Sequence, residues 1–184
     1  KLWQDSLRRA LFARAMGKLL GLNDAEEAFA AALLQDMALP LMAKEISGRY
    51  EELLNERREK RCRLSVLEQH YFGWTHAEAA ARIAKRWNLP EEFGRLIGCH
   101  TNPATLRLRP AEDPAAIAVA LSALLPTSVD DVWYERDALE ASYFKMGGRL
   151  APPILEVLGQ VDYDFADFGP VLEMTSPPQT LVEL

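Results

Sequence analysis

The stretch Glu68–Pro103, EQHYFGWTHAEAAARIAKRWNLPEEFGRLIGCHTNP, contains all three histidines and two of the four tryptophans of the chain. Thr75, followed three residues later by Glu78, has the spacing of a capping box, in which each side chain accepts a backbone N–H of the first turn. Apolar residues then recur at helical spacing as far as Trp87. This pattern predicts a helix that begins just after Thr75.

A second helix is predicted after a short break at Asn88-Leu89. Pro90 suits its first position, because a proline there loses no hydrogen bond, and the sequence TNP ends it. One face of this helix carries Phe93, Leu96, Ile97 and His100. So short a connection makes the two helices antiparallel neighbours. We therefore expect His76, at the start of the first helix, to lie near His100, at the end of the second.

Composition limits the class of protein. With 184 residues, the chain is expected to form one domain, or one domain with an appendage. Its net charge of -6 argues against a general nucleic-acid surface.

Cys62 and Cys99 are too few for a disulfide scaffold and lack metal-binding spacing, which favours a reducing, cytoplasmic location. No apolar run approaches the roughly 20 residues of a membrane span. Because Lys1 falls within a helical pattern, we expect a fragment of a longer protein.

Helical periodicity covers most of the remaining chain. Capping-box spacing at Asn23 and Glu26, and again at Ser65 and Glu68, predicts two more helix starts. Further helices are expected at Trp3–Leu20, Leu41–Ile46, Glu51–Arg63, Asp113–Leu124, Asp137–Met146 and Pro153–Leu158. Val161–Phe165 alternates like a strand but has no evident partner strand, so it is expected to be an extended connection. The predicted fold class is all-α, a multi-helix bundle.

Asp36 falls on the apolar face of a predicted helix, three residues after Leu33 and seven after Phe29. A carboxylate there must be paired, hydrogen-bonded or bound to a metal, since burying it alone is costly. The alternative is that its side chain escapes to solvent at the helix end or caps the turn before Pro40.

The segment Glu51–Arg63 is the most charged of the chain. Its cations are Arg57, Arg58, Lys60, Arg61 and Arg63, and four glutamates lie between them. Acid–base pairs four residues apart are typical of a solvated helix face. We therefore expect these cations to face solvent, and a nucleic-acid contact is the weaker alternative.

The aromatic residues near His76 could suggest a ligand site. Trp74 and Trp87, with Tyr71 and Phe72, stand at helical spacing, however. Aromatic residues in such a pattern usually pack in a core, and we expect that here. His70 is expected at the surface.

Three segments together resemble the HDOD domain: LLQDMALPLM at Leu33–Met42, E-x4-G-x-x-HAEAAARIAKRWNLPEE at Glu68–Glu92, and IGCHTNP at Ile97–Pro103. LWQDSL at Leu2–Leu7 is similar to the opening of the same half-domain. HDOD domains are signalling relatives of the HD and HD-GYP phosphohydrolases. The resemblance implies an HD-like helical bundle over residues 1–125 without the family's upstream helical half. Residues 126–175 are then expected to be a helical extension packed on it, and 176–184 a loose tail.

HD enzymes hold one or two metal ions with histidines and aspartates, and the ion activates water against a phosphoester. The resemblance implies that this chain keeps only part of that ligand set. The positions that match are Asp36, His76 and His100. The positions that differ are Asp5, Gln35 and Thr101, which replace histidines, and Ser122, which replaces an aspartate. Ala38 and Leu39 stand where the enzymes carry Gly-Lys.

These differences favour a non-enzymatic signal-transduction module that binds a partner protein or another domain of its own chain. No cofactor, metal, nucleic acid or membrane is expected as a partner, and an oligomer is compatible with the sequence. The interpretation treats Asp36, His76 and His100 as a buried polar network in which the carboxylate bonds the imidazoles. The alternatives are a vestigial metal site on these three residues and an active metal-dependent phosphohydrolase acting on a nucleotide or phosphodiester.

Overall fold

The computed structural model of the chain describes residues 1–128, 130, 132–148 and 151–184. These residues form helices and loops, with no strand among them, so the all-α prediction is confirmed. The helices are α1 (Leu2–Leu19), α2 (Glu26–Leu34), α3 (Leu39–Glu45), α4 (Ser47–Lys60), α5 (Leu64–Phe72), α6 (His76–Arg86), α7 (Glu91–Cys99), α8 (Pro114–Ser122), α9 (Arg136–Gly147) and α10 (Ile154–Phe168), with short 3₁₀ helices at η1 (Thr105–Arg107) and η3 (Gly169–Leu172). None of the described helices is both long and apolar enough to cross a membrane.

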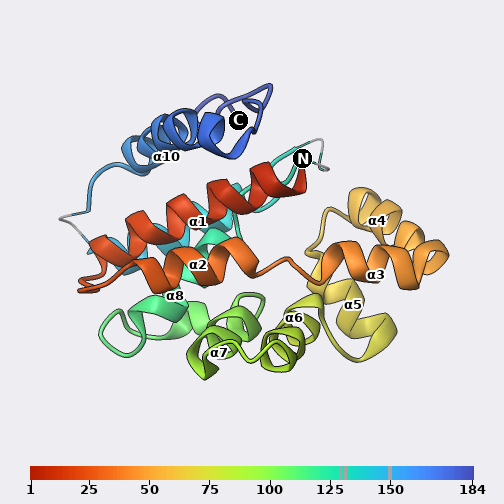
Figure 1. Cartoon of the computed structure of the whole chain (residues 1–184). Coiled ribbons are helices and arrows are strands. Elements are labelled where there is room, and N and C mark those ends of the chain that lie inside the picture. The colour runs from red at the N-terminus through yellow and green to blue at the C-terminus, as the bar shows by residue number, and fades with distance from the viewer. Residues whose placement is uncertain (129, 131, 149–150) are drawn as a thin grey trace.

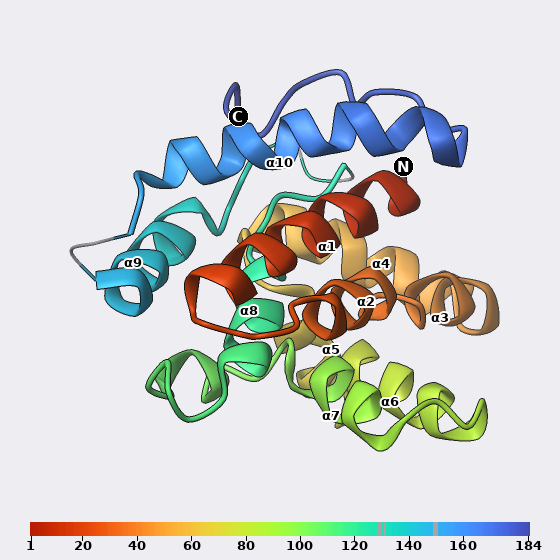
Figure 2. The ribbon, with the colours of Figure 1, turned by 60° about the vertical axis from the view of Figure 1, so that its left-hand side comes forward.

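Helix α1 is the central element of the bundle. It contacts α2, α8 and α10, and Figures 1 and 2 show it between α10 on one side and α2 on the other. Its residues from Asp5 to Ala13 are all buried. Helix α8 is buried on every side as well, which agrees with its nearly continuous run of apolar residues.

Three of the buried residues of α1 are charged, and each is bonded to a different part of the chain. The carboxylate of Asp5 accepts hydrogen bonds from the backbone N–H and the hydroxyl of Ser128. Arg8 contacts Asp162 of α10 and the tail. Arg9 is paired with Asp36, in the turn after α2. Burial makes each of these bonds necessary, because an unpaired buried charge is strongly destabilising.

The C-terminal region departs from the sequence prediction. Val161–Phe165 is part of α10, not an extended connection, because Val157, Leu158, Val161 and Phe165 recur at helical spacing and are all buried. The tail expected to be loose is anchored. Leu181 is only 1% exposed, and the carboxylate of Asp162 accepts its backbone N–H.

Only one of the three predicted capping boxes forms. Thr75 and Glu78 make both bonds of the box, as predicted. The box at Asn23 is wrong, because α2 begins at Glu26 and the side chain of Asp24 accepts the Glu26 N–H. The box at Ser65 is also wrong, because Arg63 and not Ser65 is the N-cap of α5, which begins at Leu64, and the carboxylate of Glu68 makes other contacts.

The prediction that the tryptophans near His76 are core residues is wrong. Trp87 ends α6 and is 60% exposed, while Trp74 is 38% exposed and stacks on Phe72. Trp74 lies in the loop between α5 and α6, and Trp87 directly follows α6, so neither indole is on the buried face of a helix. His70 is exposed, as predicted.

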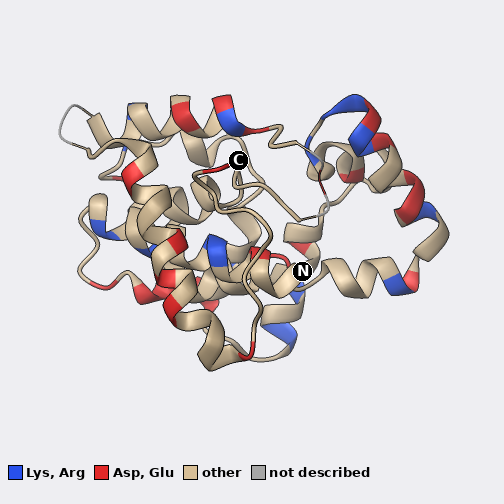
Figure 3. Cartoon of the chain, turned by 90° about the horizontal axis from the view of Figure 1, so that it is seen from above, with Lys and Arg blue, Asp and Glu red and all other residues tan. Residues whose placement is uncertain are grey.

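The basic segment of α4 is only partly a solvent face. Arg58, Lys60 and Arg61 are exposed as expected. Arg57 and Arg63 are not, because they turn inward and pair with Asp130 and Glu135. Figure 3 shows positive and negative residues interspersed over the ribbon, with no large region of one sign.

We predict that replacing Phe12 by Ala destabilises the protein by about 3–5 kcal/mol, because the ring is wholly buried in α1 and its loss leaves a cavity. Replacing Trp87 by Ala should change stability by only about 0.5 kcal/mol, since that indole is mostly exposed. Urea unfolding of both variants measures the contrast. Equal losses would contradict the packing described here.

Candidate functional site

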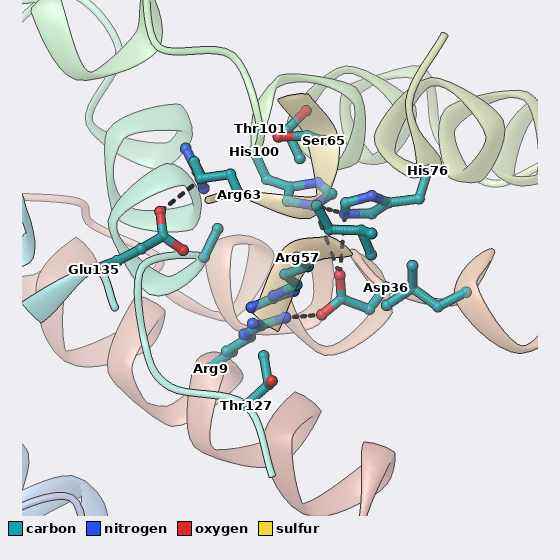
Figure 4. A pocket seen from close by; sticks show the side chains of 13 residues that line it. Arg9, Asp36, Arg57, Arg63, Ser65, His76, His100, Thr101, Thr127 and Glu135 are labelled. Carbon is teal, nitrogen blue, oxygen red and sulfur yellow. Dashed lines mark hydrogen bonds and ion pairs between the residues drawn. The ribbon is translucent and has the colours of Figure 1, made fainter. Parts of the chain in front are cut away.

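Asp36, His76 and His100 converge from three parts of the chain, as predicted (Figure 4). Asp36 lies in the turn between α2 and α3, His76 is the first residue of α6, and His100 directly follows α7. The two Nε2 atoms are 3.1 Å apart. Oδ1 of Asp36 lies 3.5 Å from Nε2 of His76 and 3.7 Å from Nε2 of His100. All three side chains are buried.

Local structure explains why the histidines meet. The capping box fixes the first turn of α6 and therefore the position of His76. Helices α6 and α7 pack closely, because glycines of α7 face Ala81 of α6. A Cβ atom at Gly98 would lie 3.2 Å from the Cβ of Ala81, tighter than an ordinary contact. This close approach brings the end of α7, with His100, against the start of α6.

Glu68 orients the imidazole of His76. One carboxylate oxygen lies 2.6 Å from Nδ1 of His76 and 2.9 Å from its backbone nitrogen. The other oxygen accepts a hydrogen bond from the Tyr50 hydroxyl at 3.0 Å. Burial and the neighbouring carboxylate raise the pKa of Tyr50, so it remains a donor. A carboxylate acceptor requires a proton on Nδ1, which leaves Nε2 of His76 as the atom that faces the cluster.

His100 is held by its own helix. Its Nδ1 lies 2.6 Å from the carbonyl oxygen of Ile97, which can only accept, so Nδ1 donates. Nε2 of His100 therefore also faces the cluster. Burial, and next the nearby His76, place the pKa of His100 well below 6.5, so this imidazole is neutral. Nε2 of both rings and a carboxylate oxygen thus converge on one spot, and all three are atom types that bind metal ions.

Arg9 supplies the nearest positive charge. Its guanidinium donates to Oδ2 of Asp36, on the side of the carboxylate away from the histidines. Burial lowers the pKa of Arg9 to about 10, which still leaves it charged at neutral pH. Two further ion pairs lie beside it: Arg57 with Asp130 at 2.5 Å and Arg63 with Glu135 at 2.8 Å. Burial raises the pKa of Glu135, with Arg63 opposing that shift.

The cluster borders a small cavity of about 50 Å³. Arg9, Asp36, His76 and His100 form one part of its wall, and the two ion-paired arginines and Glu135 form another. Ser65, Thr101 and Arg63 also line a second pocket, so the two pockets adjoin.

The other predicted site residues divide into two groups. Thr101 lines the cavity beside His100. Asp5, Gln35 and Ser122 are buried outside its lining. Asp5 bonds Ser128, and the Ser122 hydroxyl donates to the carbonyl of Val119 within α8. The amide of Gln35 is buried without a hydrogen-bond partner among the described residues.

Sequence reasoning missed several residues of the site. They are Arg9, Tyr50, Arg57, Arg63, Glu68 and Glu135. Glu68 could have been identified from the sequence, because it stands eight residues before His76 in the motif that resembles the HDOD domain. Arg9 gave the weaker signal of a charge followed at once by the apolar run Ala10–Ala13. Glu135 gave none, because its partner Arg63 is 72 residues away along the chain.

The donor set fits one metal ion. The point equidistant from Oδ1 of Asp36 and the two Nε2 atoms lies about 2.0 Å from each, close to the bond lengths zinc forms with such ligands. Glu68 behind His76 is the kind of carboxylate that commonly supports a metal-binding imidazole. Bound there, an ion would act as a Lewis acid. Among the described residues, no fourth histidine, cysteine or acid belongs to the cluster.

A comparison with protein-family models finds a match to the HDOD domain over residues 1–103, more than half of the chain. The chain belongs to the HDOD family. No curated protein and no solved structure gives a significant match. The HDOD match includes Asp36, His76 and His100 but ends before α8, so the domain boundary near residue 125 stays a prediction.

We predict that Asp36→Ala lowers the free energy of unfolding by about 3–5 kcal/mol, because it leaves the Arg9 guanidinium buried without its partner. Adding Arg9→Met should recover most of that loss, since the double variant buries no unpaired charge. Urea unfolding of both variants tests this, with exposed Asp137→Ala as the control. Losses that simply add would show that the two side chains are not coupled.

We also predict that stability falls as pH drops from about 7.5 to about 5.5, measured with a chelator present. Unfolded His100 takes up a proton near pH 6.5, whereas burial beside His76 and near Arg9 and Arg63 keeps it neutral in the fold. Protons therefore favour the unfolded chain, with a slope of up to about 1.4 kcal/mol per pH unit. His100→Asn should reduce this slope. An unchanged slope would assign it to other groups.

Proposed function

We propose that the chain is a regulatory, non-enzymatic HDOD module that acts by binding a partner protein or another domain of its own chain. The observation that carries this proposal is that Asp36, the one carboxylate of the cluster among the described residues, is already neutralised by Arg9. In a hydrolytic HD-type site, that carboxylate would serve a metal ion instead.

The ligand count supports the same proposal. A hydrolytic metal centre needs enough protein ligands to hold the ion and one open position for water. Asp5 and Ser122, which stand at expected ligand positions, bond to Ser128 and Val119 and lie outside the cluster. Gln35 is an amide in place of an imidazole and is also outside the cavity.

The size of the cavity also favours a role other than hydrolysis. A pocket for a small organic ligand usually measures about 300–1,000 Å³. The cavity beside His76 and His100 measures about 50 Å³, enough for a few atoms only. The ion pair of Arg63 with Glu135 and that of Arg57 with Asp130 form part of its wall. A cavity of this size is too small for a nucleotide.

The polar network gives the module a way to act on its surroundings. It joins α1, α4, α5, α6 and α7 through buried bonds such as Arg9 to Asp36 and Tyr50 to Glu68. Buried polar networks favour one arrangement of the groups they join. A module held in this way can present a fixed surface to a partner.

We predict no hydrolysis of bis(4-nitrophenyl) phosphate, or of cyclic dinucleotides with added Mn²⁺, above the rate of the His76→Ala variant. Product release is measured over several hours, at a protein concentration high enough that adding more protein does not change the result. Turnover that disappears in both His76→Ala and Asp36→Ala would contradict a non-enzymatic role.

The second candidate function is metal-dependent phosphodiester hydrolysis. One observation favours it: three donor atoms converge, and His76 has a carboxylate behind it. The assay above decides between the two, because only this candidate predicts turnover that depends on Asp36, His76 and His100.

A further inference from the structure

We propose that Arg9 acts as a resident cation that keeps the Asp36–His76–His100 cluster free of divalent metal. The proposal rests on the non-enzymatic function above and adds the residue responsible for it. Arg9 touches neither imidazole, so it acts through Asp36 as a positioning residue and not as a ligand.

The two oxygens of Asp36 have different partners. Oδ1 faces both histidines, and Oδ2 accepts from the Arg9 guanidinium. An ion bound by Oδ1 and the two Nε2 atoms would share this one carboxylate with Arg9. Two positive groups would then lie on opposite sides of a single negative charge.

The ion pair of Arg9 and Asp36 is almost wholly buried. Arg9 and Asp36 have side chains that are only 7% and 3% exposed, so water screens their charges little. Arg57 and Arg63 line the same cavity and add positive charge, although each has its own acidic partner. Like charges repel strongly at short range in such surroundings. Binding a divalent ion here therefore costs more free energy than the three ligand atoms alone would suggest.

Arg9 is held in place by the helix that carries it. It projects from the middle of α1, where residues Asp5 to Ala13 are all buried, so the guanidinium is enclosed. Its Nε has no hydrogen-bond partner among the described residues, and Asp36 is the acid to which it is bonded. Leaving Asp36 would strand a buried charge, which is costly. An incoming ion therefore does not easily displace the Arg9 guanidinium from Asp36.

The test is metal binding by the whole chain, purified with chelator and then dialysed. Co²⁺ reports on coordination through its visible absorption, and Zn²⁺ affinity is measured by competition with a chromophoric chelator. Arg9→Met removes the charge and keeps an unbranched apolar stem, and Arg58→Met, on the exposed face of α4, is the matched control.

We expect wild type and Arg58→Met to bind both ions weakly. Arg9→Met should bind one equivalent roughly tenfold to a hundredfold more tightly, within the range by which groups around the ligands alter metal affinity. Adding His100→Ala should abolish the gain. If Arg9→Met does not fold, the metal affinity of Arg9→Gln is measured in its place, because glutamine keeps a hydrogen-bond donor without the charge.

Two results would overturn the proposal. One is tight, stoichiometric binding by wild type that depends on His76 and His100. The other is affinity that stays the same or falls in folded Arg9→Met or Arg9→Gln, which would make Arg9 a support for the metal site. Neither result by itself implies hydrolysis, so the assay of turnover still tests the proposed function separately.

Discussion

The ion pair of Arg9 and Asp36 joins the central helix to the turn after α2 at a place where both side chains are almost wholly buried. Removing a charge from water is costly, and the pair is tolerated only because the partners meet directly. The position of Asp36 then fixes the distance to His76 and His100. The imidazoles in turn are held from behind by Glu68 and by the carbonyl of Ile97. The position of Asp36 in the site thus depends on α1 lying at the centre of the bundle.

The buried charges of α1 also explain how the rest of the chain is attached. Asp5 holds the loop at Ser128, and Arg8 holds α10 through Asp162 (Figure 2). An apolar helix could pack in several registers, whereas a buried charge has to reach its own partner. We infer that these three side chains specify the arrangement around α1 more than they add to its stability, which agrees with the small net gain expected of buried ion pairs.

Sequence reasoning predicted the parts of this structure that depend on near neighbours. The Thr75–Glu78 box, the antiparallel α6 and α7, and the meeting of His76 with His100 follow from spacing and loop length. Arg9 and Glu135 could not be predicted in the same way, since their partners are 27 and 72 residues away. The error at Val161–Phe165 has a different origin. Five residues show an alternation, but the helical spacing of α10 becomes clear only over the longer range from Val157.

The most direct test of this account is a crystal structure of protein purified without chelator, with anomalous data collected above and below the zinc absorption edge. We predict no anomalous peak between Oδ1 of Asp36 and the two Nε2 atoms, and we expect the Arg9 guanidinium to be bonded to Oδ2 of Asp36. A strong peak at that point, with Arg9 turned away from Asp36, would contradict it.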